Sequence, residues 1–351
     1  MLTIWNYKIQ FVTPAFLGDA DQSGAWRTPP FKAQLRQWWR VMYSADHDHR
    51  VSVDEMRKHE ARLFGAANDG QGSSTQSLVR LRLDRWSQGT LKRDQWKSLD
   101  PVGHPEVPGR RPTADLYLGY GPVTLKAGPL KARAAIQAGE TATLQVVLDE
   151  RVTEQDRARL QAALHLMHLL GTVGGRSRNG WGSYILEPGE KTPAWEAVPA
   201  GISRPWREAM ERVWAHALGR DERGALVWKT PNCKDWREAM VRLAQLKIKL
   251  RTQFKFRSGQ GASEPELRHW LAYPVTNHIV KDWGDRLRLP NTLRFKLRPV
   301  DGNDGVVGWI FHMPAWPPSG FAPQRWKGDI LQLWPQVHQF LDQALAPRAS
   351  L

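Results

Sequence analysis

The sequence predicts an α+β fold. Apolar and polar residues alternate over residues 5–11, 78–83 and 142–148, as expected of half-buried strands. Between these segments apolar residues recur at helical spacing, most clearly over residues 152–170. The chain has 351 residues, of which 41% are hydrophobic, and this length is sufficient for two packed cores. Fibrous and disordered classes are excluded.

The first 190 residues carry predicted elements in the order strand, helix, strand, strand, helix, strand. Pro29 and Pro30 open the first helix, and a second short helix follows at 53–64. The last strand is expected at 181–186. This order is that of a ferredoxin-like (RRM-like) unit, in which two helices cover one face of an antiparallel sheet. Residues 84–140, rich in proline, glycine and charge, are expected to be an insertion with a hairpin near 116–125.

A stretch punctuated by proline and glycine at 188–205 predicts a connection between two domains, at 1–190 and 191–351. In the second part the patterns predict helices at 206–217, 236–254 and 329–345. Strands are expected at 292–297 and 306–313.

Fifty Lys and Arg against thirty-five Asp and Glu give a net charge of +15, which favours a polyanionic partner. A single cysteine, Cys233, excludes intramolecular disulfides and cysteine-based zinc sites, and indicates a reducing compartment. There is no run of about eighteen apolar residues and no signal-peptide pattern at the N-terminus. We therefore expect a cytoplasmic protein without a membrane partner.

The most unusual segment is a glycine-rich loop at 171–182, with five glycines in twelve residues. Backbone N–H groups of Gly174 and Gly175, together with the guanidinium groups of Arg176 and Arg178, are suited to phosphate binding. Trp181 is expected to stack on a base or to anchor the loop. The alternative interpretation is an Asn-Gly hairpin turn with solvated arginines. The loop is neither a Walker loop nor a dinucleotide-binding fingerprint.

Further basic residues form a stripe on the first helix and two runs in the second part. Lys32, Arg36 and Arg40 recur every four residues, which predicts either a phosphate-binding stripe or a solvated face. No acid occurs between Val241 and Ser263, or over residues 286–298. Runs of a single sign favour contact with a phosphate backbone.

Catalytic candidates are poor. Asp19 and Asp21 lie in the loop after the first strand, where carboxylates are more often turn residues than general bases or metal ligands. His47 lies in a polar tract. No spacing suggests a Ser/His/Asp or Cys/His arrangement, and we expect no metal and no cofactor.

Several motifs resemble those of the CRISPR-associated RAMP superfamily, and more narrowly those of the first subunit of the type III-B Cmr effector. They are TPAFLG at 13–18, LRQWWR at 35–40, LFG at 63–65 and GGRSRNGWG at 174–182. The matches run in order over about residues 3–186. The resemblance implies a ferredoxin-like fold for the second domain too, and a glycine-rich loop close to guide RNA. In related backbone subunits an Asp after the first strand cuts target RNA, but the first subunit is not expected to cut.

The leading hypothesis is a non-catalytic subunit that holds the 3′ part of the guide RNA and caps the backbone filament in antiviral defence. Its expected partners are guide RNA, single-stranded target RNA and other Cmr/RAMP subunits. The alternatives are a RAMP-family endoribonuclease using Asp19, Asp21 or His47, and a tryptophan-rich docking subunit. The expected RNA-binding residues are Arg27, Lys32, Arg36, Arg40, Gly174, Gly175, Arg176, Ser177, Arg178, Asn179, Trp181, Lys249, Arg251, Arg257, Arg286 and Arg288.

Overall fold

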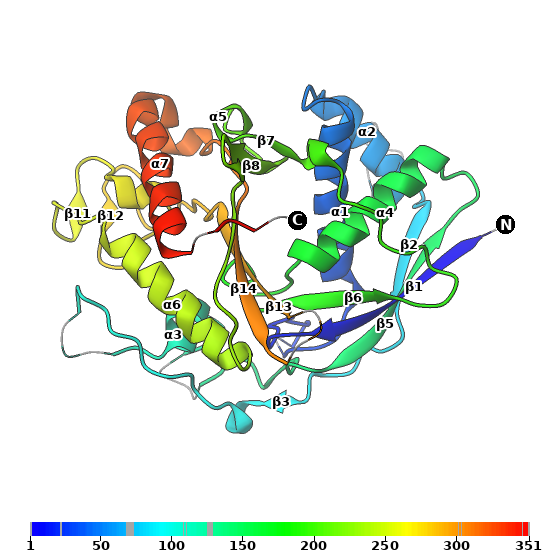
Figure 1. The fold of residues 1–351 in the computed structure, drawn as a ribbon, viewed down its shortest axis with the longest axis horizontal. Coiled ribbons are helices and arrows are strands. Elements are labelled where there is room, and N and C mark those ends of the chain that lie inside the picture. The colour runs from blue at the N-terminus through cyan, green and yellow to red at the C-terminus, as the bar shows by residue number, and fades with distance from the viewer. Residues whose placement is uncertain are drawn as a thin grey trace.

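The computed structural model describes residues 2–21, 23–67, 74–107, 109, 111–124, 129–300, 302, 304–345 and 347–349. The predicted α+β class is confirmed, since helices pack on antiparallel sheets (Figure 1). Within the described ranges no helix has the length and apolar character needed to cross a membrane.

The first half is built on a four-stranded antiparallel sheet. Its strands are β1 (Thr3–Phe11), β2 (Val79–Leu83), β5 (Thr141–Leu148) and β6 (Tyr184–Pro188), in the order β2-β5-β1-β6. Helix α1 (Thr28–Asp46) follows β1, and helix α4 (Glu154–Leu170) joins β5 to β6. Both helices lie on one face of the sheet (Figure 1). This strand order and helix placement are those of the predicted βαββαβ unit.

Local signals account for these boundaries. The side chains of Trp5, Tyr7, Ile9 and Phe11 alternate into the core from β1, while the residues between them face outward. Helix α2 (Val53–Phe64) begins where predicted because the Ser52 side chain accepts a hydrogen bond from the third residue of the helix, and it ends before Gly65, which has a φ of +81°.

The insertion contains β3 (Leu91–Lys92), a 3-10 turn (Arg93–Gln95), α3 (Ala114–Gly119) and β4 (Ala134–Ala135). The hairpin predicted at 116–125 is wrong, because residues 116–119 are helical; Leu125 lies outside the described residues. Buried Asp115 fixes this helix by accepting hydrogen bonds from Trp96 Nε1 at 2.8 Å and Leu99 N at 3.2 Å. Helix α3 contacts α6 (Trp236–Thr252) of the second half.

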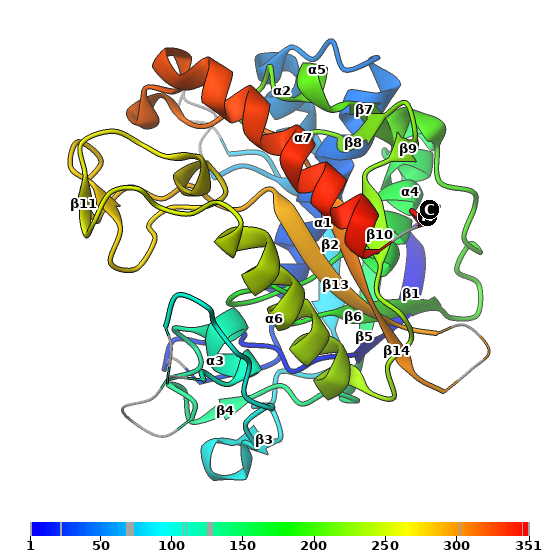
Figure 2. The same cartoon turned by 60° about the vertical axis from the view of Figure 1, so that its left-hand side comes forward.

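The second half has a three-stranded antiparallel sheet in the order β10-β14-β13. Its strands are β10 (Val227–Lys229), β13 (Leu293–Pro299) and β14 (Val306–His312). Helices α6 and α7 (Lys327–Ala344) lie on one side of the β13–β14 pair (Figure 2). The order β10, α6, β13, β14, α7 matches the first five elements of a ferredoxin-like unit. The backbone N of Ala349 donates to Val227 O at 2.9 Å, so the segment at Ala349 lies beside β10.

The helix predicted at 206–217 is wrong in length. Helix α5 is a single turn (Trp206–Ala209). The Arg204 side chain hydrogen-bonds to Glu211 and to buried His216, and these contacts hold the segment after α5 in a non-helical conformation. The chain then enters β8 (Leu218–Asp221), which pairs with two short strands. The remaining short elements are β7 (Ser203–Pro205), β8 (Leu218–Asp221), β9 (Gly224–Ala225), β11 (Gly261–Ala262), β12 (Ile279–Val280) and 3-10 turns at Ala200–Ile202, Leu267–Trp270, Ser319–Phe321 and Pro323–Trp326.

Strand β14 is buried on both faces. Trp309 and Phe311 join the apolar cluster of the first sheet, whereas Ile310 joins a second cluster. That second cluster also contains Leu118 of the insertion and Trp181 of the glycine-rich loop. The insertion and the loop therefore share a core with the second half, and the domain boundary at 190 stays a prediction.

Candidate nucleic-acid interface

The glycine-rich loop packs tightly against the segment after β1. Gly174 has a φ of +92°, and a Cβ at this position would lie 2.7 Å from the carbonyl oxygen of Phe16, so only glycine fits. The N–H of Gly175 donates to the same carbonyl at 3.0 Å. The predicted use of the Gly175 N–H as a phosphate donor is wrong in this conformation, since Phe16 occupies that donor.

Trp181 is fully buried, so the prediction that it stacks on a base is wrong. Its ring contacts Phe16, Trp96 and Trp236, with centroid distances of 5.2, 5.7 and 6.1 Å. These rings come from the first half, the insertion and α6. Trp181 therefore anchors the loop, which was the alternative role.

The loop also forms the junction with β13. Phe295 N donates to the carbonyl of Arg178 at 3.0 Å, and the Arg178 guanidinium donates to Asn291 O at 3.1 Å. One residue further on, the fully buried ammonium of Lys296 hydrogen-bonds to carbonyls at the end of α4. These contacts place the basic residues of β13 beside those of the loop.

We define the cationic cluster as Arg176 and Arg178 of the loop, Lys247 and Arg251 of α6, and Arg294 of β13. Lys247 Nζ donates to the side-chain oxygen of Asn179 at 2.7 Å, which links α6 to the loop. Lys247 and Arg251 lie four residues apart and share one face of α6. Asn179 in turn donates to Leu118 O at 2.7 Å, so the insertion supports the same arrangement.

Burial lowers the pKa values of all five groups, and the charges of other cluster members lower those of Lys247 and Arg294 further. Burial, with the nearby charges of Arg251 and Arg176, lowers the pKa of Lys247 to about 7. Burial, with the charge of Arg178, lowers the pKa of Arg294 to about 9. The pKa values of Arg176, Arg178 and Arg251 are also lowered, mainly by burial.

Few carboxylates neutralise the positive charge of the cluster. In the ranges that the structure describes, none of its five members forms an ion pair, and the buried Nε of Arg294 has no hydrogen-bond partner. Glu106 pairs with Arg268 at 2.6 Å, and its charge raises the pKa of Arg251 only as a minor effect. The cluster is therefore suited to binding a polyanion.

The match that identifies the family lies in the first half of the chain. Residues 8–185 match the family model of the RAMP superfamily. The chain belongs to the RAMP superfamily. No curated protein matches the sequence.

Two solved structures resemble this RAMP protein. One is the crystal structure of apo Cmr1 from Pyrococcus furiosus, with 16% identity, coverage of 90% of both chains and a TM-score of 0.46. The other is a type IV-B CRISPR complex, with 16% identity, coverage of 58% of this chain and 95% of that chain, and a TM-score of 0.34.

The basic stripe on α1 of the RAMP protein is engaged with α2. Arg36 Nε and Arg40 Nη2 donate to the same oxygen of buried Glu60, at 2.6 and 2.7 Å. Lys32 Nζ donates to the carbonyl of Phe64 at 2.7 Å. The stripe thus ties the two helices together, and its contact with RNA stays a prediction.

The other predicted RNA contacts are dispersed. Lys249 is exposed on the opposite face of α6 from the cluster, beside a pocket of about 480 Å³. Arg257, Arg286 and Arg288 are exposed, and Arg288 donates to the neighbouring carbonyl of Leu287 at 2.9 Å.

Half-buried Arg27 donates to Gly18 O, and Ser177 O accepts from Gly180 N at 3.1 Å. Among the described residues no hydrogen bond or ion pair connects these side chains to the cluster.

The catalytic candidates have structural roles or lie exposed. Asp19 accepts a hydrogen bond from Ser23 N at 2.7 Å and its own N–H donates back to Ser23 O, as in a turn. Asp21 is exposed. The ring of His47 stacks on Tyr43 and its Nδ1 lies 2.7 Å from the Tyr43 carbonyl. Within the described ranges no three acidic, His or Cys side chains are placed to hold a metal.

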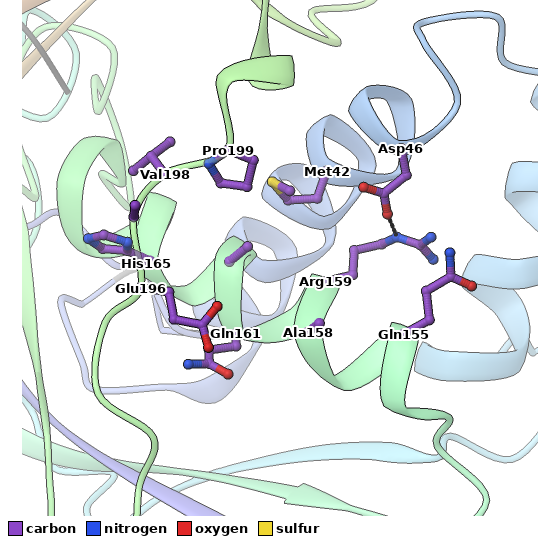
Figure 3. A pocket seen from close by; sticks show the side chains of 12 residues that line it. Met42, Asp46, Gln155, Ala158, Arg159, Gln161, His165, Glu196, Val198 and Pro199 are labelled. Atoms are coloured by element: carbon purple, nitrogen blue, oxygen red, sulfur yellow. Dashed lines mark hydrogen bonds and ion pairs between the residues drawn. The ribbon is translucent and has the colours of Figure 1, made fainter.

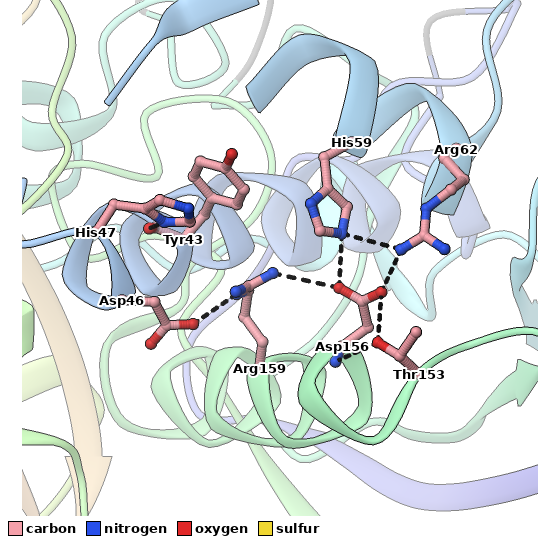
Figure 4. Close-up of polar contacts among 8 residues, drawn as sticks. All are labelled: Tyr43, Asp46, His47, His59, Arg62, Thr153, Asp156 and Arg159. Atoms are coloured by element: carbon pink, nitrogen blue, oxygen red, sulfur yellow. Dashed lines mark hydrogen bonds and ion pairs between the residues drawn. The ribbon is translucent and has the colours of Figure 1, made fainter. Parts of the chain in front are cut away.

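A polar cluster that the sequence did not reveal lies between α1, α2 and α4 (Figure 4). Asp156, 1% exposed, accepts from His59 at 2.7 Å and from Arg62, while buried Arg159 bridges Asp156 and Asp46 at 3.2 and 2.7 Å. Burial raises the pKa of Asp156, but hydrogen bonds from His59 and Thr153 and the charge of Arg62 lower it to about 2. These saturated contacts indicate helix packing rather than catalysis.

A pocket of about 250 Å³ opens beside this cluster (Figure 3). Arg159 and Asp46 line it from α4 and α1, and residues 196–199 cross it on the other side. The Arg159 guanidinium is already held by Asp46 and Asp156, so it is not available to a ligand.

Proposed function

We propose that this RAMP protein is a non-catalytic, cytoplasmic RNA-binding subunit of a type III-B (Cmr-type) CRISPR effector complex. It holds the 3′ part of the guide RNA, caps the backbone filament and contacts single-stranded target RNA and other RAMP subunits in antiviral defence. The observation that carries this proposal is the cationic cluster at the junction of the two halves.

Repulsion among the cations of the cluster destabilises the folded protein unless a bound anion neutralises part of their charge. Five cations from three elements repel one another in partly desolvated surroundings. Burial lowers the pKa of each, and repulsion by other members of the cluster lowers the pKa values of Lys247 and Arg294 further. RNA phosphates would relieve this repulsion and provide acceptors for the guanidinium groups. Function thus explains a charge arrangement that folding alone would not favour.

The mode of binding follows from what surrounds the cluster. Trp181 is buried, so the loop offers phosphate contacts without a tryptophan platform for bases. Binding is therefore expected to depend strongly on salt and weakly on sequence, with log K falling by about 0.7 per phosphate contact for each log unit of salt.

The test is fluorescence anisotropy of a labelled single-stranded RNA titrated with the full chain over a salt series. The double variant Arg176→Ala, Arg178→Ala should bind more weakly and with a salt slope flatter by about 1.4, the loss of two phosphate contacts. Arg57→Ala, Arg220→Ala removes two exposed arginines and is the matched control. An unchanged slope in the loop variant would contradict the proposal.

The same RNA, incubated with and without Mg²⁺, tests the absence of catalysis. Intact RNA on a denaturing gel is the expected result, because Asp19 is held in a turn. Cleavage that is abolished by Asp19→Ala or Asp21→Ala would favour the endoribonuclease instead.

A further inference from the structure

A small pocket adjoins the glycine-rich loop on the side of the insertion. It has a volume of about 280 Å³. Its walls include Phe16, Pro122 and Leu130, the small residues Ala132 and Gly121 add little bulk, and exposed Lys131 also lines it. The lining is therefore mainly apolar, and its size is below the roughly 300–1,000 Å³ typical of sites for larger ligands.

The pocket adjoins Arg176 of the cationic cluster, since a Cβ at the lining residue Gly121 would lie 3.7 Å from the Arg176 guanidinium. Arg176 Nε donates to the carbonyl of Tyr120 at 2.6 Å, one residue before the pocket begins at Gly121. Pro122 lies against Gly175, with its Cγ 3.0 Å from where a Cβ of Gly175 would be. A phosphate bound by Arg176 thus lies within one nucleotide of the pocket.

Phe16 gives the pocket a fixed aromatic wall. Its ring packs against Trp181 and Trp96, with centroids 5.2 and 6.0 Å away, so its orientation is set by buried neighbours. A preorganised aromatic face costs little to order and binds any base by stacking. Exposed Tyr120 stands beside the pocket with 63% of its surface accessible.

We infer that this pocket takes one unstacked nucleobase of the RNA strand whose phosphate contacts Arg176. This inference rests on the proposed RNA-binding function and adds a base subsite to it. The apolar walls and Phe16 hold the flat ring, the adjacent Arg176 holds the negatively charged backbone, and Lys131 faces the polar edge. Stacking on a ring does not discriminate strongly among bases, so the subsite fixes the position of the RNA strand without selecting a particular base.

The test compares two labelled probes, a short single-stranded RNA and an abasic oligonucleotide of the same length, which keeps the phosphates but lacks bases. The full wild-type chain should bind the base-bearing RNA about five- to a hundredfold more tightly. Ala132→Trp fills the pocket and should remove that preference, while affinity for the abasic probe and the salt slope stay unchanged.

Ala194→Trp places the same substitution at an exposed site and is the matched control. If circular dichroism shows that Ala132→Trp does not fold, Ala132→Leu is measured with the same probes. As a second readout, 2-aminopurine in the RNA should change its emission on binding to wild type but not to the filled variant.

The outcomes separate the two proposals. Equal wild-type affinity for both probes, with a steep salt slope, would overturn the base subsite and leave RNA binding intact. Absence of salt-dependent binding would overturn the proposed function itself. If Ala132→Trp keeps the preference for base-bearing RNA but fails to join its complex, a protein side chain occupies the pocket and the inference is wrong.

Discussion

The ammonium of Lys296 lies 2.6 Å from the carbonyl oxygen of Tyr184, and no carboxylate pairs with it in the described part of the chain. The carbonyls of His168 and Gly171 lie 2.7 and 2.9 Å away, and that of Met167 at 3.3 Å. The carbonyls of Met167, His168 and Gly171 lie at the C-terminal end of α4, where the helix dipole is negative, and that of Met167 also accepts from Gly171 N at 2.9 Å. A lysine from the second half thus completes the end of a helix in the first half.

Replacing Lys296 with Met should destabilise the protein by about 3 kcal/mol, because buried carbonyls lose their donor. Urea unfolding followed by tryptophan fluorescence measures the change. Lys234→Met, at an exposed position, is the control and should have little effect. An unchanged unfolding midpoint in Lys296→Met would show that other contacts alone hold β13 in place.

Trp181→Phe tests whether this residue is an anchor or a base platform. Its ring touches aromatic residues from the first half and the insertion, so the smaller ring should lower stability by about 1–3 kcal/mol. RNA affinity should stay within about twofold of wild type, since buried Trp181 contacts no solvent. A large loss of RNA affinity at unchanged stability would restore the stacking role.

Asp156→Asn tests the polar cluster between the helices. The pKa of Asp156 is about 2 in the folded protein against 3.8 for a free side chain, so its stabilisation is present above pH 3.8 and lost as the pH falls through about 2. We expect wild type to be more stable than the variant by about 2 kcal/mol at neutral pH. The difference should shrink in denaturant melts below pH 3.8.

Asp54→Asn, at an exposed position in the first turn of α2, is the control for this series. It should show little difference from wild type across the same pH range. A gap between wild type and Asp156→Asn that does not narrow in acid would mean that the carboxylate charge does not hold the helices together.

Local signals predicted the first half well because they coincide with the final packing. The alternation of apolar and polar residues in β1 specifies a strand, and the cap at Ser52 specifies the start of a helix. Tertiary packing is consistent with both local preferences. The helix predicted at 206–217 is wrong because its apolar spacing is also compatible with an irregular segment. The hydrogen bonds of Arg204 to Glu211 and His216 favour the irregular segment.

The candidate site was predictable in kind but not in arrangement. The glycine-rich loop predicts a role for Arg176 and Arg178, and the acid-free run at 241–263 predicts one for Arg251. Nothing local indicates that Lys247 and Arg294 converge on that loop rather than neighbouring Lys249 or Arg286. Their convergence depends on the docking of β13, which buried Lys296 secures.

The pKa of Lys247 makes RNA binding sensitive to pH near neutrality. Burial and the charges of Arg251 and Arg176 lower that pKa to about 7, so Lys247 is protonated below this pH and loses its charge above it. RNA affinity should therefore fall by about two- to fivefold between about pH 6 and about pH 8 at constant ionic strength. Anisotropy titrations at both pH values measure this change.

Lys247→Arg tests whether Lys247 is the group that titrates, because a guanidinium keeps its charge over this pH range. The variant also keeps a donor for the Asn179 side-chain oxygen, which lies 2.7 Å from the ammonium of Lys247. The variant should bind RNA with nearly the same affinity at both pH values. Lys249→Arg, on the opposite face of α6, should keep the wild-type pH dependence. If Lys247→Arg keeps the full dependence, another group titrates, and the lowered pKa of Lys247 has no part in RNA binding.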